Sequence, residues 1–401
     1  MNEGNLPLKG VVVLDLTQIM AGPVCTMLLA DMGADVIKIE KPNGGDDTRR
    51  MGPPFTSGWA SGFLALNRNK RSLALDLREE AGKQVFMRLL EGAHVVVENF
   101  RPGVMARLGL GYDELAKRRS SLVYCSISGF GSTGPYRNRG GFDLVAQGMS
   151  GLMSITGFPD SPPAKVGVPI TDISAGTQAA FGILCAYIHA LKTGQGQSVD
   201  ASLLEAGIAY TIWESALYFS EGEVPGPLGS AHRVSAPYQA LRTSDGYINI
   251  GAATQATWEQ FCHAVGLDDL IEDERFRMPG DRKVREGELA QLLESTLSQK
   301  STDYWLELLE QSGVVAGPIY NMEQVYQDPQ VLARNMVIDL EDNDLGKLRH
   351  IGIPVKLSET PGRIRNRAPG LGEHSREVLS EAGYSGEEIA ILIDRGTVVC
   401  G

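Results

Sequence analysis

The sequence predicts an α/β protein built on a parallel β-sheet with helices on both of its faces. Short apolar runs of strand length alternate with helical patterns between residues 11 and 127. Continuous apolar runs are typical of strands that are buried on both faces. A stretch rich in Gly, Pro and Ser at residues 221–237 marks a boundary, and the pattern changes beyond it. We therefore expect a large parallel-sheet domain and a smaller α+β domain.

The first elements form one βαβ unit. An apolar run predicts a strand at 11–16, and Gly22-Pro23 opens a helix, because proline is favoured in a first helical turn. Gly33 ends this helix, and a second strand follows at 36–40. The alternation continues with a helix at 80–91 and strands at 94–98 and 122–127.

The rest of the chain contains longer helices. An apolar helix is expected at 174–192, and another leads from SVDASLLEAG to about Phe219. Beyond the boundary we expect a strand at 247–251, helices at 256–265, 284–299 and 302–312, a hairpin within 345–358, and helices at 375–383 and 385–396.

Composition and charge exclude several classes of protein. The 401 residues carry a net charge of −12, which does not favour binding to nucleic acid or to an anionic membrane. The five cysteines are scattered without CxxC spacing, so neither a disulfide frame nor a zinc site is expected. No secretory signal is visible, and the longest apolar run, at 177–188, is too short to span a bilayer. We expect a cytoplasmic protein with no bound metal.

Common nucleotide-binding motifs are absent. The turn after the first strand, Gln18–Gly22, has no GxGxxG pattern, and the chain contains no GxxxxGK[ST]. NAD and ATP are therefore not expected as ligands. A Rossmann-like sheet can still bind another nucleotide-bearing ligand at the carboxyl ends of its strands.

Several features suit such a ligand. Asn99-Phe100 follows a predicted buried strand and pairs an amide with an aromatic face, and the glycine-rich loop at 129–143 allows close approach of its backbone. Cations are expected in loops after strands, where phosphates would bind: Lys41, Arg49, Arg50, Lys70, Arg71, Arg101, Arg107, Arg137 and Arg139.

Asp172 is a lone carboxylate between an apolar, proline-containing run and a long apolar helix. Burying an unpaired charge is costly. Aspartate is a favoured N-cap residue, and Ser174 could fill the same position. On these residues alone, an N-cap is the simplest interpretation.

Six blocks of sequence, taken together and in this order, resemble family III CoA-transferases, the CaiB/BaiF group of formyl-CoA transferase and carnitine CoA-transferase. The blocks are LKGVVVLDLTQIMAGPVCTMLLADMGADVIKIEKP, NRNKRSLALDL, VVVENFRPGVMARLGLGYDEL, SISGFGSTGP, TGQGQSVDASLLEA and APGLGEHSREVL.

The resemblance implies a role for Asp172, which matches the family's nucleophilic aspartate. It also implies a CoA-binding surface. A lysine that contacts CoA in formyl-CoA transferase falls near Gly140 here, so Arg139 is the expected substitute. The implied CoA-binding residues are Ile19, Met20, Ala21, Lys41 (where family members often carry Arg), Leu75, Arg78, Asn99, Phe100, Arg107 and Arg139.

The resemblance further implies an interlocked homodimer whose large domain is built from both ends of each chain. Residues 1–220 would form the first part of the CoA-binding domain, 221–325 the small domain with its linkers, and 326–401 the segment that returns to the large domain. The expected partners are an acyl-CoA donor and a carboxylic acid acceptor. Coenzyme A enters as a thioester substrate and no cofactor is held permanently.

The chemistry agrees with this implied role. Moving CoA between two carboxylic acids requires an enzyme carboxylate that attacks a thioester, giving a mixed anhydride and then an aspartyl-CoA thioester. Backbone N–H groups at a helix N-terminus or in glycine-rich loops can stabilise each oxyanion. A catalytic role for Asp172 is therefore favoured over the N-cap.

Two alternatives remain. An α-methylacyl-CoA racemase needs a second acid/base group, a histidine in its relatives, and the aligned position here is Phe142, next to Asp143. A non-catalytic acyl-CoA-binding protein would not need a carboxylate at 172. For the acyl group, TGFPDSPPAKVGVP resembles members that use succinyl-CoA. Arg49, Arg50 or Arg71 are candidates to hold a distal carboxylate, which favours dicarboxylic acids.

Overall fold

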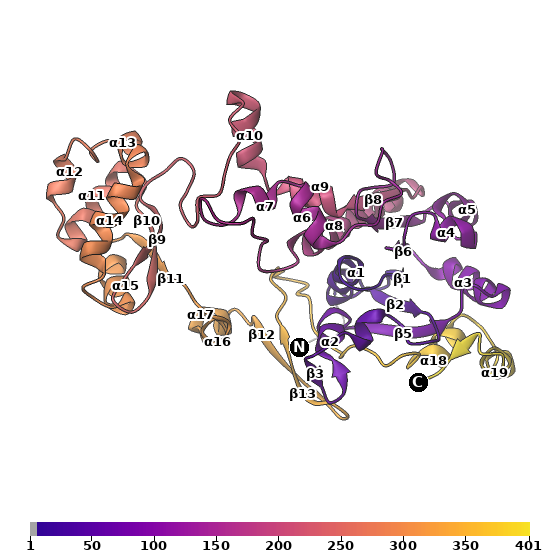
Figure 1. Ribbon diagram of the computed structural model, residues 1–401. Helices are drawn as coiled ribbons and strands as arrows, with labels where there is room; N and C mark the ends of the chain where they lie inside the picture. Colours follow the sequence, from indigo (N-terminus) through magenta and orange to yellow (C-terminus); the bar gives the residue numbers. More distant parts are fainter. Residues whose placement is uncertain (1–5) are drawn as a thin grey trace. The chain divides into compact units, whose positions relative to one another are not determined.

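The computed structural model describes residues 6–401 and contains two compact units. The larger comprises residues 6–153, 165–223 and 329–401, and the smaller comprises 154–164 and 224–328. The larger unit is built on a seven-stranded, mostly parallel sheet, so the fold is α/β (Figure 1). Its strands, in spatial order, are β14 (Val398–Val399), β5 (Lys70–Leu75), β2 (Asp35–Glu40), β1 (Val12–Asp15), β6 (Val95–Glu98), β7 (Val123–Ser128) and β8 (Ser198–Ser202).

Apolar residues cover both faces of the central strands. In β1, Val13 and Leu14 are fully buried on opposite faces, and in β6, Val95 and Val96 are divided in the same way. Because successive side chains of a strand point to opposite faces, two-sided burial requires an uninterrupted apolar run. The strands predicted from such runs are confirmed to within a residue or two.

Helices pack on each face of this sheet. One core cluster includes residues of α3 (Glu80–Gly92), α4 (Val104–Leu108), α5 (Tyr112–Arg118), α18 (Ser375–Glu381) and α19 (Gly386–Asp394). The other includes residues of α1 (Ala21–Asp31), α6 (Asp143–Met149), α8 (Ile170–Thr193) and α9 (Leu203–Ala209). The remaining elements described here are the 3-10 helix Asp47–Arg50, β3 (Phe55–Thr56), β4 (Trp59–Ala60), α2 (Ser61–Leu66), α7 (Leu152–Ile155), α10 (Ile212–Glu221) and α17 (Pro329–Ala333).

Helices α1 and α8 cross very closely at Gly176. A Cβ atom at this position would lie 2.4 Å from the carbonyl oxygen of Ala21, so no side chain fits there. This contact joins the start of α1 to α8 at the turn that follows Asp172. The loop between β1 and α1 and the start of α8 are therefore held near each other.

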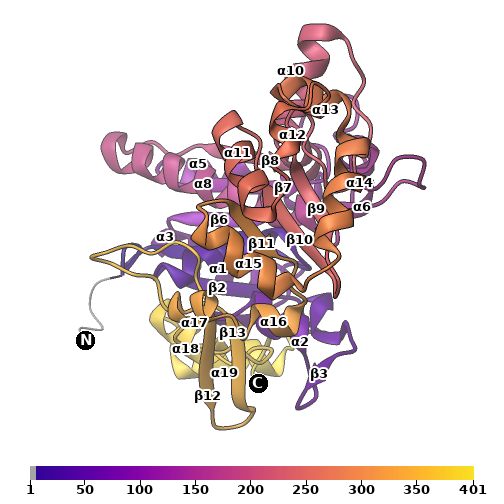
Figure 2. The same cartoon turned by 90° about the vertical axis from the view of Figure 1, so that its left-hand side faces the viewer.

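The C-terminal segment completes the sheet. β14 pairs antiparallel with β5, and the Ser72 hydroxyl accepts a hydrogen bond from the Gly372 N–H (2.9 Å). Figure 2 shows this yellow segment beside the violet N-terminal elements. A two-stranded hairpin, β12 (Val337–Asp342) and β13 (Gly346–Ile351), precedes it. The hairpin thus lies earlier than the predicted range of 345–358, which was wrong in its placement.

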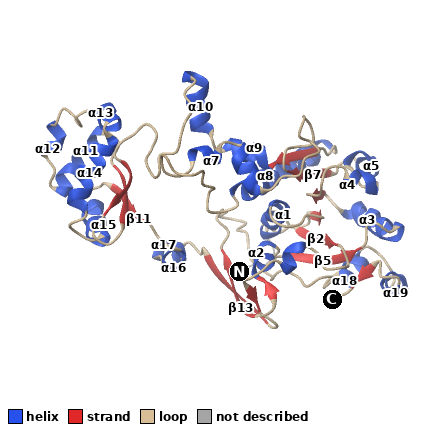
Figure 3. Cartoon of the chain, viewed as in Figure 1, coloured by secondary structure: helices blue, strands red, loops and turns tan. Residues whose placement is uncertain are grey.

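The smaller unit combines a three-stranded antiparallel sheet with helices (Figure 3). The strands are β9 (Tyr238–Arg242), β10 (Tyr247–Gly251) and β11 (Val315–Pro318). The helices are α11 (Gln255–Val265), α12 (Asp269–Glu272), α13 (Pro279–Val284), α14 (Glu286–Leu297), α15 (Thr302–Gln311) and α16 (Met322–Val325). The predicted strand at 247–251 is confirmed.

The sequence analysis did not predict three strands of the large sheet: β5, β8 and β14. Residues 198–202, expected to lead directly into a helix, form the edge strand β8, and two helices, α9 and α10, follow it. Within residues 6–401, no helix combines the length and apolar character that a membrane span requires.

Candidate active site at the carboxyl edge of the sheet

Asp172 lies in the first turn of α8 as its third residue. The helix begins at Ile170, and its N-cap residue, Pro169, makes no side-chain cap. Asp172 is therefore not the N-cap. Nor is Ser174, which is buried inside the helix and accepts a hydrogen bond from the Gln178 side chain (3.2 Å). The N-cap interpretation of both residues is wrong.

The capping contact comes instead from Asp143, the first residue of α6. Its carboxylate accepts hydrogen bonds from the N–H (2.9 Å) and the hydroxyl (2.8 Å) of Thr171. The fully buried Gln147 donates to the same carboxylate (2.7 Å) and accepts from the Val166 N–H (2.9 Å). A negative charge near a helix N-terminus is favourable. Asp143 and Gln147 thus fix the start of α8 and the loop before it.

The Asp172 carboxylate is half-buried, and it has no hydrogen bond or ion pair with any residue of the described chain, 6–401. Burial raises its pKa from 3.8 to about 6, and the negative charge of Asp143 contributes to the same rise. A poorly solvated carboxylate with a pKa near neutrality is typical of a functional site. Such a group combines ionisation at pH 7 with high reactivity toward an electrophile.

Asp172 lies at the carboxyl edge of the parallel sheet. Helix α8 leads back into the parallel strand β8, so it runs antiparallel to the strands and begins at the edge where they end. Ligands of open α/β sheets bind at this edge. The sequence-predicted binding residues follow the carboxyl ends of β1, β2, β5, β6 and β7, which are neighbours in the sheet, and the structure therefore brings their loops to one side.

The loop after β1 holds an unusual backbone conformation. Ile19 has φ +69°, a left-handed value that is strained for a β-branched residue. Its side chain is 40% exposed, whereas Ala21 is buried at the start of α1. Such strain persists only where the surroundings determine the backbone strongly, and it occurs most often at functional sites.

Asn99 supports this loop directly. Its side-chain oxygen accepts from the Gln18 N–H and its amide donates to the Gln18 carbonyl, both at 2.8 Å. Both functional atoms of the amide are thus engaged with backbone. Phe100, which follows, packs against the apolar core of the sheet.

The other predicted binding residues differ in how far their side chains are buried or already paired within the protein. Leu75 is buried at the end of β5, the Arg78 guanidinium donates two hydrogen bonds to Asp76, and Lys41 pairs with Asp47 (2.9 Å). Arg139 lies over the rings of Phe130 and Tyr136, with its guanidinium carbon 4.6 Å from the Tyr136 centroid. Arg107 is in the last turn of α4.

Several of the expected loop cations have other roles. Lys70 and Arg71 were expected after a strand, but they are the first residues of β5, and Lys70 is buried against Asp15 (3.0 Å). Their assignment to the carboxyl edge is wrong. Arg71 pairs with three carboxylates, Asp35, Glu377 and Glu381. Arg49 is held by both oxygens of Glu40, and Arg50 pairs with Asp47.

A cavity of about 240 Å³ opens at the ends of β6 and β7. Phe100 and Arg137 line it together with Glu98, Ser128 and Ser132, which the sequence did not suggest as site residues. Burial raises the pKa of Glu98, whose carboxylate accepts from the Phe100 N–H (2.9 Å). Asp143 and Gln147 were also missed. The only signal for Asp143 was its position in the glycine-rich loop, and a partner 28 residues away cannot be read from spacing.

The titration of Asp172 gives a first prediction. If Asp172 is the nucleophile that the resemblance implies, with a pKa of about 6, kcat/KM is expected to rise ~tenfold per pH unit below that value and to level off above it. Asp143→Asn removes the neighbouring charge, so the midpoint is expected to move to lower pH. Initial rates measured between pH 4.5 and 8 check both statements. An unchanged midpoint in Asp143→Asn contradicts the coupling.

Comparisons with known proteins agree with this geometry. A family model described as CoA-transferase family III matches residues 8–375. The chain is 40% identical over 382 residues to the succinate–glutarate CoA-transferase of Agrobacterium fabrum, covering 94% of this chain and 95% of that protein. It is 38% identical over 393 residues to the succinyl-CoA:glutarate CoA-transferase of Homo sapiens, covering 98% and 90%.

The fold has a solved counterpart. A crystal structure of a CaiB/BaiF family protein from Brucella suis superimposes with a TM-score of 0.85 at 39% identity, over 94% of this chain and all of that one (100%). The residues matched by the family model include β1, the glycine-rich loop and the start of α8, and the two relatives match 94% and 98% of the chain. The chain belongs to CoA-transferase family III.

Proposed function

We propose that this enzyme transfers CoA from succinyl-CoA to a dicarboxylic acid such as glutarate, with Asp172 as the nucleophile. The observation that carries the catalytic part is the half-buried Asp172 carboxylate, which has no partner within residues 6–401 and a pKa of about 6. The substrates rest on the relatives from Agrobacterium fabrum and Homo sapiens, which are named for succinate or succinyl-CoA and glutarate.

The proposed reaction has four steps, and all of them involve the Asp172 carboxyl group. Asp172 attacks the succinyl-CoA carbonyl and expels CoA thiolate, leaving a mixed anhydride. The thiolate attacks the Asp172 carbonyl and releases succinate, which leaves an aspartyl-CoA thioester. Glutarate attacks that thioester and again expels thiolate. The thiolate then attacks the glutaryl carbonyl of the new anhydride, giving glutaryl-CoA and free Asp172.

Each step places negative charge on a carbonyl oxygen next to α8. The Thr171 N–H is occupied by Asp143, and the first bond into the helix runs from the Ile173 N–H to Pro169 (3.1 Å). The Asp172 N–H has no partner in the described part of the chain. We assign it as one donor to the oxyanion, because unpaired N–H groups at a helix N-terminus bind anions.

We propose that CoA binds along the carboxyl edge of the sheet, with its thioester at Asp172. The loop–α8 contact at Gly176 and Ala21 supports this placement. The residues proposed to contact CoA are Ile19, Met20, Ala21, Lys41, Leu75, Arg78, Asn99, Phe100, Arg107 and Arg139.

A direct assay tests the activity. Purified enzyme with succinyl-CoA and glutarate is expected to form glutaryl-CoA and succinate in equal amounts, as measured by mass spectrometry. Without acceptor, intact-mass analysis is expected to detect a covalent adduct on the protein, which a non-catalytic CoA-binding protein would not form. Oxalate and adipate serve as shorter and longer acceptors. Absence of transfer to every dicarboxylate would contradict the proposal.

The racemase alternative makes a different prediction. Inversion at Cα requires a proton donor opposite the base. Phe142, in the N-cap position of α6, carries a hydrocarbon side chain that is 76% exposed. We expect (R)-2-methylacyl-CoA to keep its configuration during incubation in D₂O, as followed by chiral chromatography and deuterium content. Rapid inversion without an acceptor acid would favour the racemase.

We also propose an interlocked homodimer in which residues 1–220 and 326–401 build the CoA-binding domain and 221–325 the small domain. The pairing of β14 with β5 supports a domain made from both ends of the chain. Helix α10 supports the dimer, because none of its residues is buried, although Ile212 and Phe219 are apolar. Large exposed apolar patches mark sites of association.

A further inference from the structure

The backbone of the loop after β1 is held by side chains rather than by other backbone groups. Thr17 is buried, and its N–H donates to the Asp15 carboxylate (2.9 Å). Its carbonyl accepts from the ammonium group of Lys38 (2.9 Å). Here the polar backbone groups of Thr17 are both bound to charged side chains.

Side chains also hold the backbone of the next two residues. Both backbone groups of Gln18 bond to the Asn99 amide. The Ile19 N–H donates to the Asp46 carboxylate (3.2 Å). The side chains that hold the loop come from β1, β2, the segment after β2 and the segment after β6. A short backbone segment is thus fixed from several directions.

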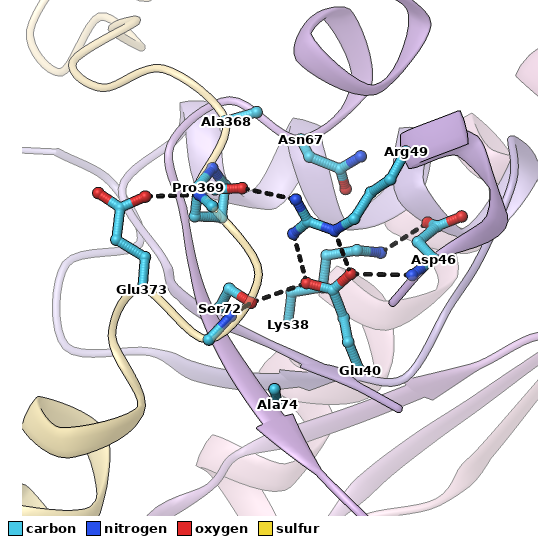
Figure 4. Close-up of polar contacts among 12 residues, drawn as sticks. Lys38, Glu40, Asp46, Arg49, Asn67, Ser72, Ala74, Ala368, Pro369 and Glu373 are labelled. Atoms are coloured by element: carbon cyan, nitrogen blue, oxygen red, sulfur yellow. Dashed lines mark hydrogen bonds and ion pairs between the residues drawn. The ribbon is translucent and has the colours of Figure 1, made fainter. Parts of the chain in front are cut away.

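Lys38 and Asp46 form the buried centre of this arrangement. They pair at 2.9 Å, and both side chains have no exposed surface. The Asp46 N–H donates to the Glu40 carboxylate (2.9 Å), whose two oxygens also accept hydrogen bonds from the Nε and one Nη of Arg49 (Figure 4). A buried ion pair adds little net stability compared with apolar residues of similar volume. The effect of the Lys38–Asp46 pair is therefore better sought in the conformation of the loop after β1.

We propose that Lys38 and Asp46 are positioning residues, which hold residues 17–20 in the conformation that binds the CoA thioester. The bond from Asp46 keeps Ile19 at its strained, positive φ. Ile19, Met20 and Ala21 are then already ordered before CoA binds. The entropy of ordering this loop is therefore lost on folding rather than on binding. The inference rests on the proposed function only in placing CoA at this loop.

Three measurements on the full-length protein test the proposal. The first is hydrogen–deuterium exchange of a peptide covering residues 16–21 in the free enzyme. The second is the Kd of CoA itself, measured by calorimetry, which requires no turnover. The third is the KM for succinyl-CoA compared with the KM for glutarate. If the enzyme fails to use glutarate, the first two still decide the role of Lys38 and Asp46.

Asp46→Ala is expected to accelerate exchange in this peptide and to raise the Kd of CoA ~tenfold, which corresponds to ordering the backbone of about one residue on binding. The KM for succinyl-CoA should rise similarly, while the KM for glutarate stays near its wild-type value. Unchanged exchange, or faster exchange with wild-type CoA affinity, overturns the proposal.

Asp31→Asn is the matched control. Asp31 pairs with Arg68 (2.7 Å), is equally buried, and lies at the far end of α1, where it makes no hydrogen bond to residues 17–20. It should destabilise the fold without changing CoA affinity, and equal weakening of CoA binding in this variant overturns the proposal.

Should Asp46→Ala fail to fold, the double variant Lys38→Met/Asp46→Asn removes both buried charges together. It frees the Thr17 carbonyl but keeps an acceptor for Ile19, so a roughly threefold rise in Kd is expected from the same loss of ordering. Wild-type affinity in this variant would count against the role of Lys38.

Discussion

Replacing Asp172 by asparagine is expected to lower CoA transfer at least ~1,000-fold, because the amide cannot attack a thioester and no other carboxylate takes its place. CoA binding should persist, since the proposed mechanism places Asp172 at the reacting carbonyl rather than at the nucleotide. The rate of glutaryl-CoA formation and the Kd of CoA, measured on the same preparation, check both parts. Asp172→Ala should behave alike.

The same substitution is expected to stabilise the protein above neutral pH. The pKa of Asp172 is higher in the folded state, about 6, than its ordinary value of 3.8. The folded state therefore binds the proton more tightly, and the wild type loses stability as pH rises from about 4 to about 6. At pH 7.5 the loss is up to about 3 kcal/mol, since one pKa unit is worth about 1.4 kcal/mol.

Thermal unfolding at pH 4.5 and at pH 7.5 tests this statement. The Tm of Asp172→Asn should exceed that of the wild type at pH 7.5, and the difference should shrink at pH 4.5. Asp143→Asn is the contrasting variant, because Asp143 holds Thr171 and Gln147 and its loss should destabilise the fold. Substantial turnover by folded Asp172→Asn would refute the nucleophile assignment.

The second large effect concerns the dimer. The protein is expected to sediment as a dimer at every concentration down to the nanomolar range, because separating the two chains of the proposed interlocked dimer would require unfolding. A helix of 10 residues with no fully buried residue is marginal in water, and a second copy of the chain would supply a surface that covers α10. Analytical ultracentrifugation of fluorescently labelled protein provides the measurement.

Substitutions in α10 distinguish the proposed dimer from a non-specific association. Ile212→Ser with Phe219→Ser removes two side chains that are 75% and 81% exposed in one chain. The double variant is expected to unfold at a lower temperature or to fail to assemble. Val284→Ser, which is 82% exposed in the smaller unit, is the control and should have little effect. A native monomer of the wild type at low concentration would contradict the dimer.

The sequence predicted those strands whose two faces are both apolar. β1, β6 and β7 follow this pattern, and β2 follows it except for the buried Lys38 and its polar ends; each was expected within one or two residues. β5 begins with Lys70, Arg71 and Ser72, whose polar groups find partners in the surrounding structure, and so it carries no such pattern. β8, with the sequence SVDAS, is an edge strand with a half-exposed, polar composition.

The start of α8 was misplaced for a related reason. Asp172 looked like an N-cap because local signals place helix starts at Asp or Ser. The helix instead begins at Ile170, since Asp143 accepts the Thr171 N–H from a separate helix. The resemblance to the family pointed to Asp172 itself. Neither the resemblance nor the local sequence pattern indicated the residues, such as Asp143, that hold the start of α8. Asn99 and Asp46 likewise act on a loop far away in sequence.

The order in which the chain is synthesised gives the C-terminal strand a further consequence. The core of the smaller unit lies between Leu241 and Val314, so it is available once that stretch has left the ribosome. One apolar face of the large sheet is completed by residues that are synthesised after the smaller unit: Val378, Leu379, Ile389, Leu392 and Val398. Until they arrive, Leu73 and Leu75 of β5 lack part of their covering. A nascent chain paused before this segment therefore presents an uncovered sheet, the kind of surface that chaperones bind.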